Sequence, residues 1–193
     1  AFSEDGSVEL GTSRFEKRGI ALRLPKWIKE NCIQCGNCVL TCPHSALQAL
    51  LVDSDIENAD SFAQAYGLKD KLYKILLSPE DCTGCGACAK VCPAIKKALE
   101  MVEAQDILDE KIAEYHSGKQ APVAKQTIFP KTMAKGLQFE KSLFEFSGAC
   151  AGCGETPYIK LLTMLNGSDM MIANTTGCSS IYGGTFGSCP FGK

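Results

Sequence analysis

Residues 32–43 read CIQCGNCVLTCP and residues 82–93 read CTGCGACAKVCP, so one spacing of four cysteines and a proline occurs twice. Thiolates bind iron–sulfur centres, and three of them at such short intervals can reach three corners of one 4Fe–4S cube. In each run the fourth cysteine stands one residue further off and is directed away by the proline that follows it. The two runs therefore predict two 4Fe–4S clusters.

The fourth cysteine of this spacing ligates the other cluster in two-cluster bacterial ferredoxins. The expected ligand sets are therefore Cys32, Cys35, Cys38 and Cys92 for one cluster, and Cys82, Cys85, Cys88 and Cys42 for the other. Each half supplies a strand, a loop and a helix that cannot bury a cluster alone. We expect an α+β fold in which residues 31–103 form a ferredoxin-like domain.

Zinc and disulfide bonds are the alternatives for these eight cysteines. Zinc usually takes two C-x2-C pairs or mixed Cys/His ligands, and it has no use for a third cysteine at the same interval. A disulfide framework indicates a secreted chain, but the first ten residues, AFSEDGSVEL, are polar and lack the apolar core of a secretion signal. Twelve cysteines in such a chain favour a reducing, cytoplasmic and oxygen-poor setting.

Composition excludes several classes of partner. The formal net charge is −2, which argues against nucleic acids and anionic membranes. No apolar run approaches the roughly 20 residues that a membrane span needs. Hydrophobic residues make up 45% of the chain, which is enough for a packed core in at least part of it.

Hydrophobic patterning predicts the elements around the two runs. Residues 1–30 are expected to form an N-terminal extension with a strand near 20–24. Residues 104–140 are expected to form a linker. It begins with an amphipathic helix over 104–115 and continues without periodicity from 116 to 136. Between these, we expect a helix that starts near Pro43, a helical turn or two over 59–66, a strand over 72–77 and a helix over 94–101.

The last segment, residues 141–193, has the order strand, glycine-rich turn, helix, strand, which is typical of an α/β unit. The strands are expected at 143–146 and 170–174, and Pro157 is expected in the first turn of a helix that continues to Leu165. Cys150, Cys153 and Cys178 then meet where two strands end. They predict a third metal site, for which a 4Fe–4S cluster and zinc both remain open.

Three further residues have two interpretations each. Cys189 is either the fourth ligand of the third site or an unligated residue of the tail. His44 either tunes a cluster by hydrogen bonding or lies on the surface. His116 is either a metal ligand or, as we favour, a solvated loop residue.

Several blocks of the chain resemble the thiamine-diphosphate-dependent 2-oxoacid:ferredoxin oxidoreductases, and pyruvate:ferredoxin oxidoreductase in particular. The most specific blocks are CAGCGETPY at 150–158 and GCSSIYGG at 177–184. Further matching stretches are FEKRGIA at 15–21, NCIQC at 31–35 and SPEDCTGC at 78–85. The resemblance extends from about residue 14 to residue 184, whereas residues 185–193 depart from the family pattern.

The resemblance implies that residues 141–193 begin a thiamine-diphosphate-binding domain. It implies that Cys150, Cys153 and Cys178 ligate a third 4Fe–4S cluster, and that Glu155 and Cys178 approach the thiamine. Thiamine diphosphate and magnesium belong only to the complete enzyme, because the segments that anchor them and the pyruvate site do not occur in these 193 residues.

The resemblance also implies a function. Such an enzyme decarboxylates pyruvate to acetyl-CoA, and its clusters carry the electrons to ferredoxin or flavodoxin. The remaining domains or subunits would be partners of this chain, and the complete enzyme would be a homodimer. The alternative is a stand-alone electron carrier of the polyferredoxin type without substrate chemistry, for which residues 14–103 would suffice.

Overall fold

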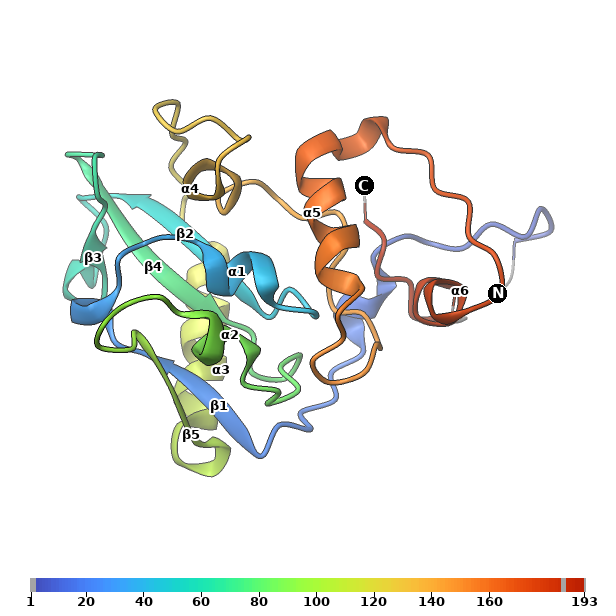
Figure 1. Cartoon of the computed structure of the whole chain (residues 1–193), viewed down its shortest axis with the longest axis horizontal. Coiled ribbons are helices and arrows are strands. Elements are labelled where there is room, and N and C mark those ends of the chain that lie inside the picture. The colour runs from blue at the N-terminus through green and yellow to red at the C-terminus, as the bar shows by residue number, and fades with distance from the viewer. Residues whose placement is uncertain (1–2, 185–186, 193) are drawn as a thin grey trace.

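The computed structural model describes residues 3–184 and 187–192 and contains two small antiparallel sheets (Figure 1). Residues 1–2, 185–186 and 193, which fall in the predicted N-terminal extension and thiamine-diphosphate segment, lie outside this description. In one sheet, β1 (Arg23–Trp27) pairs with β5 (Leu99–Glu103). In the other, β4 (Lys71–Leu77) pairs with both β2 (Leu47–Asp53) and β3 (Ala63–Gln64).

Each sheet joins the two halves of the repeat. β1 precedes the first cysteine run and pairs with β5, which follows the second run. β2 follows the first run and pairs with β4, which precedes the second. The predicted strand over 72–77 is confirmed by β4. The strand predicted near 20–24 is displaced to Arg23–Trp27, because its backbone partners in β5 begin only at Arg23.

Two short helices lie inside the cysteine runs, α1 (Asn37–Thr41) and α2 (Ala87–Val91), and they pack against each other. Each follows a left-handed glycine, Gly36 at φ 80° and Gly86 at φ 73°. The helices predicted near Pro43 and over 94–101 were wrong. Both helices end before the Cys-Pro pair, and the chain beyond continues into β2 and β5, because these segments have strand partners in the opposite half.

The long helix α3 (Ala104–Gln120) covers the sheets by packing on β1, β4 and β5. It begins where the sequence predicted, and it buries Ala104, Ile107 and Tyr115. The prediction that residues 116–120 belong to an irregular linker was wrong, because the helix continues through them. Residues 59–66 contain one 3-10 turn, η3 (Ala59–Ser61), followed by β3.

The core lies between the sheets, α3 and the cysteine runs. Tyr73 is 1% exposed and makes edge-on ring contacts with Trp27 and Phe139, with ring centroids 6.2 and 6.0 Å away. Four of the cysteines belong to the same buried cluster: Cys32, Cys42, Cys88 and Cys92. The sulfur atoms are therefore part of the core around which this region folds.

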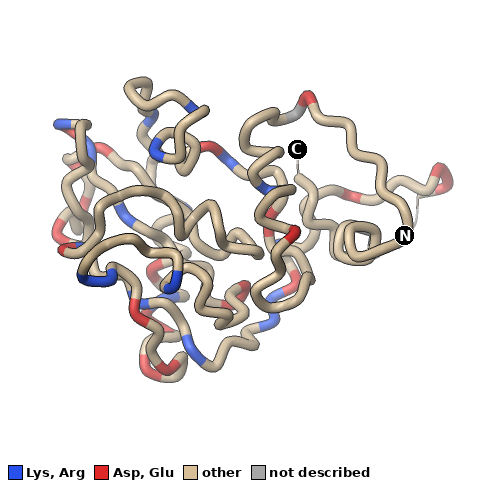
Figure 2. Tube along the Cα trace, in the orientation of Figure 1, with Lys and Arg blue, Asp and Glu red and all other residues tan. Residues whose placement is uncertain are grey.

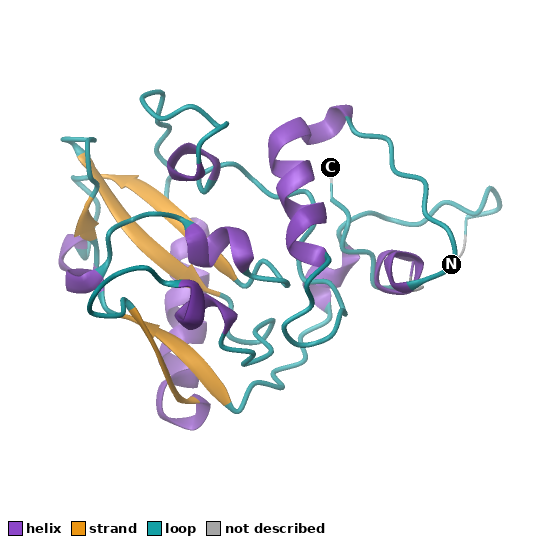
Figure 3. Ribbon diagram, viewed as in Figure 1, coloured by secondary structure: helices purple, strands orange, loops and turns teal. Residues whose placement is uncertain are grey.

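The C-terminal part contains α5 (Thr156–Asn166) and α6 (Cys178–Gly184), which Figure 3 shows apart from the strands. Pro157 in the first turn of α5 confirms the predicted helix start. The two strands predicted at 143–146 and 170–174 were wrong. Residues 170–174 have no regular structure, and Phe144 makes one isolated bridge with Phe191. A strand needs a neighbouring strand for its backbone groups, and the described residues offer none here.

The remaining short elements are η1 (Thr12–Phe15), η2 (Lys29–Asn31), α4 (Ala134–Leu137) and η4 (Gly167–Asp169). Basic and acidic residues alternate over the ferredoxin-like part, whereas the trace around α5 and α6 carries few charges (Figure 2). In the part of the chain that the structure describes, no helix is long and apolar enough to cross a membrane.

Candidate iron–sulfur site

One cavity is lined by cysteines from both runs. Its walls include Cys42 of the first run together with Cys82, Cys85 and Cys88 of the second. Gly86 and the start of α2 lie at the same wall, and β1 and β5 contribute Pro25 and Met101. The fold thus brings the fourth cysteine of one run to the first three of the other.

The other four cysteines share a second environment. Burial, together with the nearby thiols of Cys32, Cys35 and Cys92, raises the pKa of the Cys38 thiol to about 12. The pKa of Cys32 is also raised, mainly by burial, and Cys35 and Cys92 contribute again. Cys92 therefore lies close enough to the first run to act on its thiols, although it belongs to the second run.

The thiols around the cavity are perturbed in the same direction. Burial, together with the nearby thiols of Cys42 and Cys85, raises the pKa of Cys82 to about 12. The Gly84 N–H, which donates to the Cys82 sulfur at 3.4 Å, acts in the opposite direction. Burial and Cys42 raise the pKa of Cys88. Without a cation such thiols stay protonated, so only a metal centre would hold them as thiolates.

Two features of the site bear on the kind of metal centre that it could hold. Among residues 3–184 and 187–192, no three His, Cys, Asp or Glu side chains converge tightly enough to hold one metal ion. A cube bound at its corners keeps the ligands further apart. Thr83 also lines the cavity, and its hydroxyl is buried without a hydrogen-bond partner in the described chain, so a cluster sulfur would satisfy it.

His44 follows Pro43 at the wall of this cavity and is only 3% exposed, so the surface interpretation was wrong. Its Nδ1–H donates to the carbonyl of Ser147 at 2.9 Å, because a carbonyl oxygen can only accept. Burial lowers the pKa of His44. The Phe146 N–H in turn donates to the His44 carbonyl at 3.0 Å, so this histidine joins the cavity to the C-terminal segment.

Cys150 and Cys153 lie in one turn beside that cavity. The Cys153 N–H donates to the Cys150 carbonyl at 3.0 Å. A methyl group placed on Gly152 between them would lie 3.6 Å from Cβ of Cys85. The turn that carries two of the predicted third-site ligands therefore lies beside Cys85, a predicted ligand of the second cluster.

Cys178 begins α6 and is exposed. Burial raises the pKa of Tyr182, and Glu155, Cys153 and Cys178 act on it in the same direction, so all three lie around this phenol. Glu155 is exposed and occupies the N-cap position of α5, where its side chain makes no capping hydrogen bond. Burial acts to raise the pKa of the Cys153 thiol, but the backbone N–H groups of Thr156 and Glu155 outweigh burial, so the pKa is lowered.

Cys189 has different surroundings. It is buried, its N–H donates to the Thr12 hydroxyl at 2.8 Å, and its sulfur lies 3.7 Å from the Phe191 carbonyl oxygen. These contacts fasten the C-terminal tail to the N-terminal segment. His116 is exposed on α3, where its ring packs edge-on against Tyr115.

Lys160 on α5 is a residue that the sequence analysis missed. It is 2% exposed, and its ammonium donates to the carbonyls of Val39 and Cys42, the latter at 2.7 Å. Burial lowers its pKa to about 8, while Cys42, Glu145 and Cys38 oppose the change. One sequence signal pointed to it, since Lys160 is the only Lys or Arg between positions 142 and 192.

The two cysteine runs also lie within matches to known iron–sulfur families. Residues 31–96 and 74–128 match two families that are both described as 4Fe–4S dicluster domains. The two matches overlap and together contain all eight cysteines of the two runs.

Nearly the whole chain also matches part of much longer enzymes. It is 49% identical over 199 residues to pyruvate:ferredoxin oxidoreductase of Moorella thermoacetica, covering 98% of this chain and 17% of that protein. It is 45% identical over 192 residues to pyruvate-flavodoxin oxidoreductase of Klebsiella pneumoniae, covering 97% of this chain and 16% of that protein.

A more distant relative is the pyruvate dehydrogenase [NADP(+)] of Cryptosporidium parvum, at 41% identity over 199 residues, covering all of this chain and 10% of that protein. The chain thus spans a sixth or less of the length of these relatives. It corresponds to an internal iron–sulfur electron-transfer segment of the pyruvate:ferredoxin oxidoreductase family.

Proposed function

We propose that residues 31–103 bind two 4Fe–4S clusters with crossed ligation. Cys32, Cys35, Cys38 and Cys92 would hold one cluster, and Cys82, Cys85, Cys88 and Cys42 the other. The observation that carries this assignment is the single cavity shared by Cys42 and the first three cysteines of the second run. The clusters would supply one-electron transfer.

The protein's own residues prepare both sites. Left-handed Gly36 and Gly86 turn the chain into α1 and α2, and each helix ends beside the cysteine that crosses to the other half. The paired strands then hold the halves together. Burial of Cys32, Cys42, Cys88 and Cys92 would limit the access of water to the clusters, and solvent exposure influences reduction potentials.

We further propose that Cys150, Cys153 and Cys178 hold a third 4Fe–4S centre. The position of Gly152, where an added methyl would lie 3.6 Å from Cβ of Cys85, supports a site beside the second ligand set. Tyr182 supports it as well, because Cys153, Cys178 and Glu155 all act on its phenol. In this proposal residues 104–140 connect the ferredoxin-like domain to residues 141–193, which begin a thiamine-diphosphate-binding domain with Glu155 and Cys178 near the cofactor.

For the complete protein we propose oxidation of pyruvate to acetyl-CoA in the cytoplasm of an organism that lives with little oxygen. Thiamine diphosphate and magnesium would bind only in the complete protein, because the segments that anchor them do not occur in these 193 residues. The names of the relatives support ferredoxin or flavodoxin as the electron acceptor. Assembly as a homodimer, without nucleic-acid partners, is part of the same proposal.

Anaerobic reconstitution followed by iron and sulfide analysis tests the cluster assignment. Two cubes require about eight irons per chain and three require about twelve, counting four for each cube. Addition of thiamine diphosphate and pyruvate should leave the clusters of this chain oxidised, whereas the complete protein should reduce them. Four irons or fewer per chain would contradict the proposal. Failure of the complete protein to reduce its clusters with pyruvate would favour the stand-alone carrier.

A further inference from the structure

The buried ammonium of Lys160 needs a counter-charge that the protein does not provide directly. Its hydrogen-bond partners are two neutral carbonyls, those of Val39 and Cys42. Among the residues described, no ion pair joins it to a carboxylate. A buried charge without such compensation is strongly unfavourable, because its desolvation is not offset by an opposite charge.

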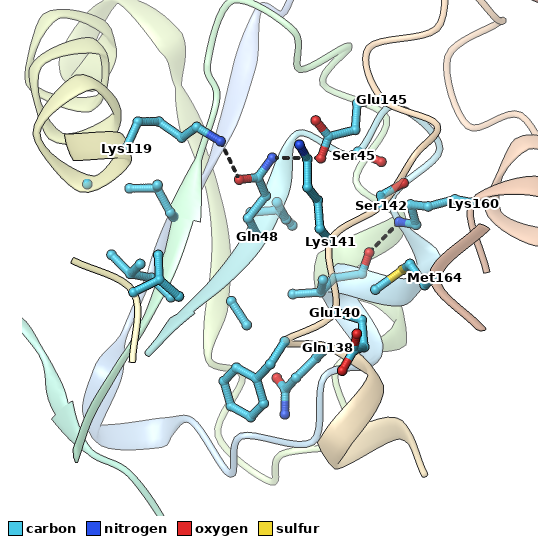
Figure 4. A pocket seen from close by; sticks show the side chains of 18 residues that line it. Ser45, Gln48, Lys119, Gln138, Glu140, Lys141, Ser142, Glu145, Lys160 and Met164 are labelled. Atoms are coloured by element: carbon cyan, nitrogen blue, oxygen red, sulfur yellow. Dashed lines mark hydrogen bonds between the residues drawn. The ribbon is translucent and has the colours of Figure 1, made fainter. Parts of the chain in front are cut away.

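The nearest carboxylate does not resolve this problem. Glu145 acts on Lys160 electrostatically, but no ion pair joins the two side chains, and burial raises the pKa of Glu145. Its Oε1 accepts a hydrogen bond from Gln48, which Lys119 contacts at 3.5 Å. Figure 4 shows Lys160 and Glu145 as separate members of the wall of one pocket, each with its own hydrogen bonds.

The surroundings of Lys160 point instead to the cysteines. Its nitrogen lies 2.7 Å from the carbonyl oxygen of Cys42, which belongs to the second ligand set. Cys38 of the first set also acts on it electrostatically. The ammonium therefore lies near both proposed clusters, at the end of α1. A cluster held by four thiolates carries net negative charge, so it is the counter-charge that this site lacks.

We propose that Lys160 is the buried counter-ion of the two ferredoxin-type clusters and raises the reduction potential of the cluster that Cys42 ligates. This inference rests on the proposed crossed ligation. Reduction by an external donor such as dithionite would add one electron, and so one negative charge, to a cluster, and the nearby ammonium would stabilise that charge. Because Lys160 belongs to α5, the C-terminal segment would set the potential of the ferredoxin-like domain.

Three substitutions separate charge from packing. Lys160→Met keeps the volume and removes the charge, Lys160→Gln keeps an N–H donor without the charge, and Lys160→Arg keeps the charge. Lys131→Met is the matched control, because Lys131 is exposed and donates to the Leu165 carbonyl of the same helix at 3.1 Å. Each variant is reconstituted in the full chain and titrated potentiometrically by electron paramagnetic resonance.

At the wild-type midpoint potential, Lys160→Met and Lys160→Gln should lower the ratio of reduced to oxidised cluster about tenfold, which equals a shift of about 59 mV for one electron. Lys160→Arg and Lys131→Met should retain the wild-type midpoint. If Lys160→Met does not take up clusters, the comparison of the midpoint potentials of Lys160→Gln and Lys160→Arg tests the proposal instead. Unchanged midpoints in the neutral variants, with full iron content, overturn the inference and leave the ligation intact. Absence of 4Fe–4S signals in the wild type overturns the ligation itself.

Discussion

The ferredoxin-like region, residues 31–103, and the C-terminal region, residues 141–192, both carry cysteines at C-x2-C spacing, but they hold them differently. In the first region, four cysteines belong to the core, and strands from both halves enclose them. In the second, Cys150 and Cys178 are exposed, and no strand forms among the residues described. The first region buries cysteines of both runs in its core, whereas the second presents Cys150 and Cys178 at a surface.

The largest expected difference between the regions concerns cluster removal. Chelation should abolish the near-UV circular dichroism of the ferredoxin-like region. Without the clusters, no metal–thiolate bonds would join the two halves of this region through the core residues Cys32, Cys42, Cys88 and Cys92. Hydrogen exchange should show loss of protection in β2 and β4. A cluster-free sample with native near-UV signals and protected strands would contradict this expectation.

Cysteine substitutions in the C-terminal region should act on metal content and not on the fold. Cys178→Ser should remove the third centre, about four irons per chain, because Cys178 lies with Cys153 around Tyr182. Cys189→Ser should retain those irons, because its sulfur faces the Phe191 carbonyl. Iron analysis distinguishes the two variants. If both lose the third centre, Cys189 is its fourth ligand after all.

Glycine substitutions sharpen the comparison at the level of the backbone. Gly36→Ala should cost about 2–3 kcal/mol of stability, because Gly36 has φ 80° and the added methyl would lie 3.0 Å from both the Ala134 carbonyl oxygen and Gln138 Cβ. Gly154→Ala in the C-terminal region meets no atom within 4 Å and should change stability by about 0.5 kcal/mol or less. Anaerobic thermal unfolding of the cluster-loaded proteins measures both, and equal unfolding temperatures would refute the difference.

The smallest expected effect concerns one hydroxyl group. Tyr73→Phe should cost about 1–2 kcal/mol, because the buried Tyr73 hydroxyl donates to Gln138 Oε1 at 2.8 Å and that oxygen would be left without its donor. Tyr158→Phe is the control in the other region, since Tyr158 is 69% exposed. The same unfolding experiment applies, and a destabilised Tyr158→Phe beside an unchanged Tyr73→Phe would reverse the comparison.

The sequence predicted the ferredoxin-like region well where local spacing determines the structure. The cysteine runs, the strand at 71–77 and the start of α3 at Ala104 follow from residues close together in the chain. The helices placed after Pro43 and Pro93 were wrong, because the pairing of β2 with β4 and of β1 with β5 joins segments far apart in the chain. Short apolar runs do not reveal such partners.

The C-terminal region was less predictable for a related reason. Residues 143–146 and 170–174 have strand-like composition, but strands form only where neighbouring strands accept their hydrogen bonds. Lys160 escaped notice because a lysine on a helix is ordinarily exposed, and only the position of α5 against α1 shows that it is buried. Gly36 and Gly86, by contrast, adopt the αL conformation, which glycine tolerates better than other residues, so sequence and backbone are consistent at these positions.

Crossed ligation is the central claim, and spectroscopy of reconstituted Cys42→Ser tests it most directly. The variant should lose or alter the cluster bound by Cys82, Cys85 and Cys88, and the signals of the cluster bound by Cys32, Cys35 and Cys38 should persist. The reciprocal Cys92→Ser variant should show the opposite pattern and so identifies which signal belongs to which cluster. Loss of the Cys32 cluster in Cys42→Ser, with the second cluster intact, would contradict the account.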